Sequence, residues 1–310
     1  IYSDRAIRES IPEFLLRFWN VYSFFVIYAN IDGFDPAKDF NGSPGQLESA
    51  KLAGGKNYRS VEQRGELDRW VLSELQLMVS KVTECMDAYD NYGACQSIES
   101  FLDGLSNWYV RRSRDRFWAK DRESVDKSDA YWTLYECLVT MAKVVAPFVP
   151  FVSETIWRNL SGVFGDQTPE SVHLCDYPTA NEQWQDDVLS ERMALLREVA
   201  SLGRSARMEA KLKVRQPLAL VEVILANPEH QGWLADHGKI LANELNVKEV
   251  AYTQDAEEYI NYLVQPNFKR VGPRVGKLMP KVKKWLNTAD GASLLAERKA
   301  NGHVSTEIDG

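Results

Sequence analysis

The chain has 310 residues, of which 45% are hydrophobic and 26% are charged, and its formal net charge is −7. This composition is ordinary for a folded globular protein and excludes collagen-like, fibrous and wholly disordered classes. The net negative charge also argues against a uniformly basic nucleic-acid binder, because affinity for phosphate comes from clustered lysine and arginine. Any contact with nucleic acid must therefore come from a local concentration of cations.

The chain ends and the cysteines narrow the class further. The chain begins at Ile1 without an initiator Met or a signal sequence, and it stops just after an expected short strand, so we expect both ends to be cuts in a longer protein. The longest apolar stretches, within residues 21–31 and 144–152, are shorter than the roughly 18 residues of a membrane span, so no membrane partner is expected. The four cysteines form no CxxC pair, which argues against a disulfide framework or a zinc site and fits a reducing cytoplasm: Cys85, Cys95, Cys137 and Cys175.

Apolar residues recur every three or four positions along the first half, which is the spacing of amphipathic helices. The expected helices cover residues 4–31, 67–86, 93–118, 129–147 and 150–160. Residues 32–64 contain prolines and glycines and are expected as a surface connection, and residues 171–178 as an extended strap that closes the bundle. The sequence thus predicts an α-helical bundle over residues 1–183.

The pattern changes in the second half. After an expected helix over about residues 186–208, a β-branched run at 218–225 and an alternating run at 247–252 flank a helix-like stretch at 233–245, which predicts a β-α-β unit. An extended piece, a basic helix and a terminal helix and strand complete the module, at residues 259–268, 274–286 and beyond. The expected fold is therefore mainly α, with a small and truncated α/β junction domain at residues 184–310.

The sequence carries no complete catalytic signature. It lacks GxGxxG, GxxxxGK[ST], HExxH and GxSxG motifs, and its four histidines lie far apart. His230 and His237 could share a helix face, but no cysteine or third close ligand joins them, so solvated surface histidines are the better interpretation. We expect no catalytic residue, no metal and no cofactor in this chain.

Residues 107–122 form a first basic segment, in which six cations oppose two aspartates for a local balance of +4. On a helix, Arg112, Arg116 and Lys120 lie at i, i+4 and i+8 and form a basic edge. Arginine forks suit phosphate, and aromatic faces suit unstacked bases, here those of Trp108, Phe117 and Trp118. The segment therefore favours single-stranded RNA as a partner.

A structural interpretation of the same residues stays open. Trp108 and Trp118 are better explained as core anchors, and the arginines could form salt bridges, for example Arg111 with Asp115. So many cations with so few acids nearby nevertheless repel one another unless an anion binds, which favours the RNA interpretation for the arginines.

Residues 265–285 form a second basic segment with seven cations and no acid, a balance of +7. Nucleic acid is the natural partner, although a basic amphipathic helix can also lie on a membrane surface or on an acidic protein. The cations are Lys269, Arg270, Arg274, Lys277, Lys281, Lys283 and Lys284.

Several runs of sequence resemble the isoleucyl-tRNA synthetases over nearly the whole chain. FWNVYSFF at 18–25, LSNWYVRRSRDRFW at 105–118 and APFVPFVSETIW at 146–157 resemble the anticodon-binding bundle of that family. The third run is shared by several class I synthetases, whereas the second is more particular to the isoleucine enzymes. VRQPL at 214–218, NELNVK at 243–248 and PNFKRVGPRVGK at 266–277 resemble the C-terminal junction region.

The resemblance implies a reaction that takes place outside this chain. The full enzymes activate isoleucine with ATP, with magnesium implied, and transfer it to their tRNA in the cytoplasm. The catalytic domain with its HIGH-like and KMSKS-like motifs has no counterpart here, nor has the editing domain. Some family members bind zinc near the C-terminus through cysteine pairs, and their absence here places the chain closer to the zinc-free, eukaryote-like branch.

The resemblance also implies a partner, the anticodon stem-loop of the isoleucine tRNA. One alternative is the same domain of a valyl or leucyl enzyme, and another is a helical scaffold that binds acidic proteins through the same patches. The candidate RNA-binding residues are Arg111, Arg112, Arg114, Arg116 and Lys120 in the first segment and Lys269, Arg270, Arg274 and Lys277 in the second.

Overall fold

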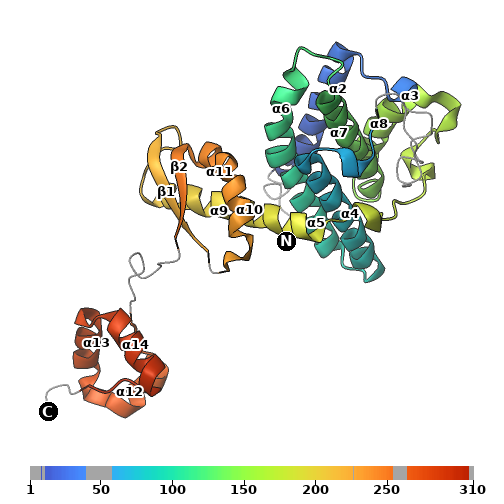
Figure 1. Ribbon diagram of the computed structural model, residues 1–310. Helices are drawn as coiled ribbons and strands as arrows, with labels where there is room; N and C mark the ends of the chain where they lie inside the picture. The colour runs from blue at the N-terminus through green and yellow to red at the C-terminus, as the bar shows by residue number, and fades with distance from the viewer. Residues whose placement is uncertain (1–7, 9–10, 40–57, 226, 254–263, 307–310) are drawn as a thin grey trace. The chain divides into compact units, whose positions relative to one another are not determined.

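The computed structural model describes residues 8, 11–39, 58–225, 227–253 and 264–306 (Figure 1). The chain divides into two compact units, Ile1–Leu195 and Leu196–Gly310. Helix α9, Asp187–Glu209, contributes residues to both units. The predicted boundary between residues 183 and 184 stays a prediction.

The first unit is a helical bundle, so the mainly α prediction is confirmed. A π-helical turn at Ile11–Leu15 leads into its first long helix, and a second one joins α5 to α6. The helices are α2 (Leu16–Asp32), α3 (Pro36–Asp39), α4 (Glu66–Asp87), α5 (Asn91–Gly104), α6 (Arg111–Trp118), α7 (Val125–Val144), α8 (Pro150–Ser161) and the start of α9, with 3-10 turns at Val61–Gln63, Gly162–Gln167, Val172–Leu174 and Glu182–Trp184.

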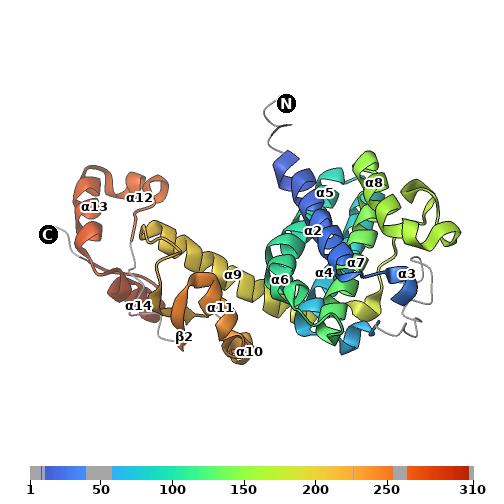
Figure 2. The ribbon, with the colours of Figure 1, turned by 90° about the horizontal axis from the view of Figure 1, so that it is seen from above.

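Helix α7 forms the centre of this bundle. Every residue from Asp129 to Val144 is buried, and helices α2, α4, α6 and α8 pack against it (Figures 1 and 2). Because its neighbours surround it, α7 is buried on all sides and lacks the single apolar stripe of a surface helix. Helices α2, α4, α6 and α8 each present one face to α7, which fixes where their outer faces lie.

Helix α2 with the preceding turn, Ile11–Asp32, is long and apolar enough to cross a membrane by length and composition alone. In the bundle, however, Phe18, Val21 and Phe25 are buried, and the Phe25 ring packs against the rings of Tyr131 and Tyr135 of α7. A single helix of this kind is weak evidence for a membrane span, because the core helices of folded domains and signal sequences meet the same criteria. The expectation of no membrane partner stays a prediction.

The surface connection expected at residues 32–64 is wrong at its C-terminal end, which is buried. Residues 40–57 lie outside the described residues, but Tyr58, Val61 and Arg64 are buried. Arg64 donates hydrogen bonds of 2.6 and 3.1 Å to the two carboxylate oxygens of Glu136 on α7. This part of the connection therefore belongs to the core of the bundle. The sequence did not reveal it, because Arg64 and Glu136 lie 72 residues apart and their pairing produces no periodic pattern. The strap expected at residues 171–178 is wrong in part, because Val172–Leu174 form a 3-10 turn, whereas Ser171 and Cys175 on either side have extended backbone angles.

The predicted β-α-β unit is confirmed in the second unit. Strands β1 (Leu218–Ile224) and β2 (Val247–Thr253) pair in parallel, from Leu218 opposite Val247 to Ile224 opposite Thr253. A 3-10 turn at Pro228–His230, α10 (Gln231–Asp236) and α11 (Gly238–Leu245) connect them. Gly203 of α9 permits close packing on α11, because a Cβ there would lie 2.7 Å from the Leu245 side chain.

The expected basic helix at residues 274–286 is wrong in its extent. The structure has α12 (Phe268–Val275), a 3-10 turn at Gly276–Leu278, α13 (Met279–Thr288) and α14 (Gly291–Asn301). Gly276 adopts a positive φ of 50°, and Pro280 occupies the first turn of α13, so one helix ends and another begins here. Residues 264–267 and 302–306 form no strand, and the remainder of both expected strands lies outside the described residues.

Candidate nucleic-acid interface

Helix α6 carries the first basic segment and is continuous with α5 through the π-helical turn Leu105–Val110. The apolar residues of this turn are buried: Leu105 and Tyr109 have no exposed surface, and Trp108 is 5% exposed. The turn thus packs into the bundle, and the polar residues that follow it begin α6. This places arginines on both the inner and the outer side of α6.

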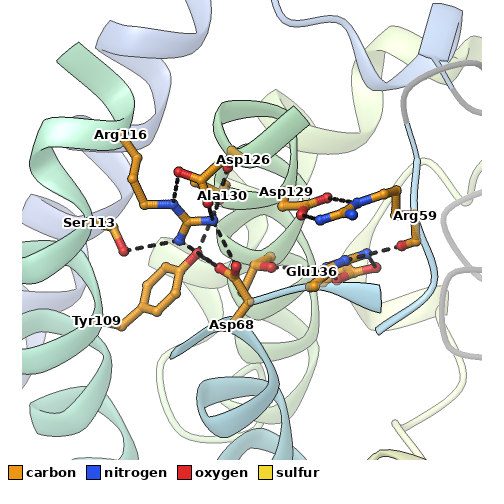
Figure 3. Close-up of polar contacts among 11 residues, drawn as sticks. Arg59, Asp68, Tyr109, Ser113, Arg116, Asp126, Asp129, Ala130 and Glu136 are labelled. Carbon is orange, nitrogen blue, oxygen red and sulfur yellow. Dashed lines mark hydrogen bonds and ion pairs between the residues drawn. The ribbon is translucent and has the colours of Figure 1, made fainter. Parts of the chain in front are cut away.

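The inner arginine is Arg116, which pairs with Asp68 in the first turn of α4 (Figure 3). Its Nη1 and Nη2 atoms donate hydrogen bonds of 2.9 and 2.7 Å to the two Asp68 carboxylate oxygens. Its Nε atom donates a further bond of 3.0 Å to Asp126 at the start of α7. Tyr109 donates a bond of 2.6 Å to the same Asp68 carboxylate. One guanidinium therefore joins α6 to two other helices.

Burial governs the energetics of this pair. Asp68 is fully buried, and the Arg116 side chain is 16% exposed. Burial disfavours the charged guanidinium, but the hydrogen bonds with Asp68 and the negative charge nearby outweigh it and raise the pKa of Arg116. Burial and the adjacent Asp68 carboxylate also raise the pKa of the Tyr109 hydroxyl. Arg116 stays charged and Tyr109 stays neutral, so both can donate hydrogen bonds to the Asp68 carboxylate.

These contacts change the role that we assign to Arg116. Its donors face acceptors of the protein, so we remove it from the candidate phosphate-binding surface and assign it to the anchoring of α6. The sequence around Asp68 already indicates that this carboxylate needs a buried partner. Asp68 precedes the buried residues Val71 and Leu72 by three and four positions, and a carboxylate on a buried stripe requires a buried cation or donor.

A second ionic cluster fixes the segment that follows α6. Lys127 donates a hydrogen bond of 2.8 Å to the carbonyl of Ala119 and lies 2.7 Å from Asp32 at the end of α2. Tyr131 also donates to Asp32. Burial opposes the charge on Asp32, but the hydrogen bonds from Lys127 and Tyr131 outweigh it and lower the pKa of this carboxyl group.

The other four candidates of the first segment lie at the outer side. Arg111, Arg114 and Lys120 are exposed, and Arg112 is half-buried. Arg111 donates a bond of 2.7 Å to the carbonyl of Asn107, and its guanidinium carbon lies 6.0 Å from the centre of the Trp108 ring. Because α6 ends at Trp118, the expected i, i+4, i+8 edge does not extend along one helix to Lys120.

The aromatic residues of the segment divide between core and surface. The expectation that Trp108 is a core anchor is confirmed by its burial, but the same expectation for Trp118 is wrong, because Trp118 is 53% exposed. Phe117, expected beside the basic edge, is buried and packs edge-on against Phe24 and Tyr131. Of the three aromatic residues, Trp118 is the one whose face is open for stacking.

The second basic segment presents its described cations to solvent. Lys269 and Arg274 of α12 and Lys281, Lys283 and Lys284 of α13 are exposed. The side chains of Arg270 and Lys277 lie outside the described residues. Two of the four candidates of this segment, Lys269 and Arg274, are therefore exposed. Three further lysines of the same segment, which were not candidates, are also exposed.

The described residues contain no group of three or more His, Cys, Asp and Glu side chains that could hold a metal ion. His237 stacks on Trp233 with ring centres 3.9 Å apart, and its Nδ1 atom lies 2.8 Å from the Trp233 carbonyl oxygen. The thiols of Cys85, Cys95, Cys137 and Cys175 form no disulfide with one another.

Comparison with known proteins places these features in a family context. Residues 68–224 match the family model described as the anticodon-binding domain of tRNA ligase. A protein of Clostridium acetobutylicum named isoleucine-tRNA ligase is 38% identical over 100% of this chain and 27% of its own length. Proteins of the same name from Thermus thermophilus and Dehalococcoides mccartyi are 38% and 43% identical, over 92% and 86% of this chain. The chain spans about a quarter of the length of these relatives.

Proposed function

Because the chain belongs to the family of anticodon-binding domains of tRNA ligases, we propose that it is the part of an isoleucine-tRNA ligase that binds the anticodon stem-loop of the isoleucine tRNA. Membership of this family implies binding of tRNA. The identity of the tRNA is the proposed part, and it is supported by the shared name of the relatives that match most of the chain.

The observation that carries the proposal is the outer surface of α6 and the turn after it. Arg111, Arg114 and Lys120 are exposed there together with Trp118. Guanidinium and ammonium groups bind backbone phosphates, and an exposed indole offers a stacking surface for an unpaired base. Arg116 and Lys127 hold this surface to the bundle, so its geometry exists before RNA arrives.

The chemistry of the whole protein forms a second part of the proposal. We propose that isoleucine is activated with ATP and magnesium in a catalytic domain of the longer protein, and that the reaction takes place in the cytoplasm. Within this division of labour, the present chain positions the tRNA, and the rest of the protein joins the amino acid to it.

The proposal is tested by measuring the affinity of the 310-residue chain for three RNA stem-loops that carry isoleucine, valine and leucine anticodons. Fluorescence anisotropy at near-physiological salt is a suitable measurement. We expect the isoleucine stem-loop to bind most tightly, with an affinity that falls as salt rises. Equal affinity for all three would contradict specific anticodon recognition by this chain, and tighter binding of the valine or leucine stem-loop would favour the related enzymes.

A further inference from the structure

The loop between α9 and β1, residues 210–217, carries three cations that were not among the candidate residues (Figure 1). Lys211, Lys213 and Arg215 are exposed, and no acid lies between residues 210 and 217. This loop also lies within the region that matches the anticodon-binding family. Its positive charge is therefore concentrated, accessible and part of the shared domain.

The conformation of this loop is fixed by a buried arginine. Arg207 on α9 is 5% exposed. Its Nη2 atom donates a hydrogen bond of 2.8 Å to the carbonyl of Lys213 and another to the carbonyl of Gln216. Its Nε and Nη1 atoms are buried and find no acceptor among the described residues. A buried charge that binds loop carbonyls is costly to keep, and what it supplies here is a defined loop shape.

A second clamp holds the other side of the loop. Asn246, at the end of α11, donates a bond of 2.9 Å from its side-chain amide to the carbonyl of Val214. Its own carbonyl accepts a bond of 3.1 Å from the backbone N–H of Leu218. The cations therefore project from a loop whose backbone is held at three carbonyl groups, those of Lys213, Val214 and Gln216.

Lys211 occupies a backbone position that favours glycine. The N–H of Leu212 bonds to the carbonyl of Arg207, and the N–H of Lys211 bonds to that of Met208, which is the hydrogen-bond pattern of a Schellman helix end. The residue at the turn of this motif is left-handed and is usually glycine, yet here it is Lys211 with a φ of 56°. A cation therefore occupies a position where a residue without a side chain would relieve backbone strain.

From these contacts we infer that the loop at residues 210–217 is a further binding site for RNA backbone phosphates, formed by Lys211, Lys213 and Arg215 and positioned by Arg207 and Asn246. The inference rests on the proposed function and adds a site to it. Because the loop is ordered by folding, little conformational freedom is lost when the phosphates bind. The expected ligand is the sugar-phosphate backbone, so this site contributes affinity without reading bases.

The sharpest test is Lys211→Gly, because glycine suits the positive φ and removes the cation. We expect the melting temperature to stay the same or rise while the affinity for the isoleucine stem-loop falls several-fold. The slope of log affinity against log salt should decrease by about 0.7–0.9, the value for one phosphate contact. A variant that is as stable as the parent and binds the RNA equally well, with an unchanged salt slope, would overturn the assignment for Lys211.

The complete site is tested by the triple variant Lys211→Gly, Lys213→Ala and Arg215→Ala, which should lose about a hundredfold in affinity. The matched control removes three exposed lysines elsewhere in the same unit, by Lys239→Ala, Lys248→Ala and Lys299→Ala, and should lose far less. An equal loss of RNA affinity in the two triple variants would overturn the site, because it would show that only the net charge of the chain matters.

Two outcomes separate this inference from the proposed function. If the parent chain does not discriminate among the stem-loops, the proposed function fails, whatever the loop does. If the parent chain prefers the isoleucine stem-loop, but the triple variant binds it with the same affinity as the parent, the loop inference fails and the proposed function stands. Binding of polyglutamate that depends on the three cations, while RNA binding does not, would also overturn it and identify an acidic protein surface as the ligand.

Discussion

Residues 107–122 and residues 265–285 both concentrate positive charge, but they present it differently. In the first segment Arg116 is held by Asp68 and Asp126 inside the bundle, while its exposed neighbours face outward. In the second segment the described cations of α12 and α13 are all exposed, and no acid interrupts them in sequence. A count of charges treats the two segments alike, whereas burial shows that one of them also uses an arginine as a structural anchor.

This difference matters for affinity because the two arrangements resist salt differently. A buried pair keeps its strength as salt rises, since water and ions do not reach it, whereas exposed cations are screened over about 10 Å at 0.1 M salt. The first segment combines the two, with a salt-resistant anchor beneath salt-sensitive contacts. Variants that separate anchor from contact therefore test the comparison directly.

The largest effect is expected from Asp68→Ala, which leaves Arg116 charged and without its main partner. Removal of one member of a buried pair costs about 3–5 kcal/mol of unfolding free energy, measurable by urea denaturation. The control is Asp103→Ala, which removes a partly exposed pair with Arg17 and should cost at most about 1 kcal/mol. A loss for Asp68→Ala no larger than that of the control would show that the pair does not anchor α6.

Charge reversal at the exposed positions should act on RNA binding instead. We expect Arg114→Glu with Lys120→Glu to lower the affinity for the isoleucine stem-loop about a hundredfold and to flatten its salt dependence, without a change in unfolding free energy. Reversal of Arg116 would be uninformative here, because it disrupts the buried pair.

The corresponding pair in the second segment is Lys283→Glu with Lys284→Glu. A similar loss of affinity in both double variants would show that both segments contact RNA. If reversal at Arg114 and Lys120 left binding unchanged while reversal on α13 abolished it, the outer surface of α6 would not be an RNA contact.

A smaller effect, which depends on pH, is expected from Asp32→Asn. The folded-state pKa of Asp32 lies below its ordinary value of 3.8, so the carboxylate stabilises the fold fully above that pH and loses this contribution as the pH falls through the lowered value. We expect the variant to be about 1–2 kcal/mol less stable at pH 7. Urea denaturation should show this deficit shrinking below about pH 4, and a deficit that stays constant at pH 3 would exclude the carboxylate charge as its cause.

The smallest effect is expected from Trp118→Ala. Its indole is half-exposed, so stacking on one base should contribute about 1 kcal/mol, the lower end of the range for aromatic stacking. The affinity for the stem-loop should fall several-fold with an unchanged salt slope, since no charge is removed. A fall in unfolding free energy with unchanged affinity would instead assign Trp118 to packing.

The sequence predicted the elements whose signal is local. The periodic helices of the bundle and the β-α-β unit are confirmed, because amphipathic spacing and β-branched runs report on backbone structure within a few residues. The errors concern contacts between distant residues. The burial of Arg64 depends on Glu136, and the position of Arg116 depends on Asp68, and neither partner is close in sequence.

Local geometry accounts for the remaining differences. The exposure of Trp118 follows from its place one residue after the buried Phe117, because successive side chains of a helix point about 100° apart. The break between α12 and α13 follows from the positive φ of Gly276 and from Pro280. The candidates Lys269 and Arg274 remain predictions as RNA contacts, as do the four outer residues of the first segment.

The π-helical turn Leu105–Val110 holds one residue more than an α-helical turn. Because the wider turn absorbs this residue, the helix that follows keeps the side-chain directions that a regular helix one residue shorter would give it. Deletion of a single residue within the turn would therefore leave Arg116 facing Asp68. The same deletion inside α6, before Arg116, would rotate the residues that follow by about 100° and separate the pair. The turn thus tolerates a change in chain length that α6 itself does not.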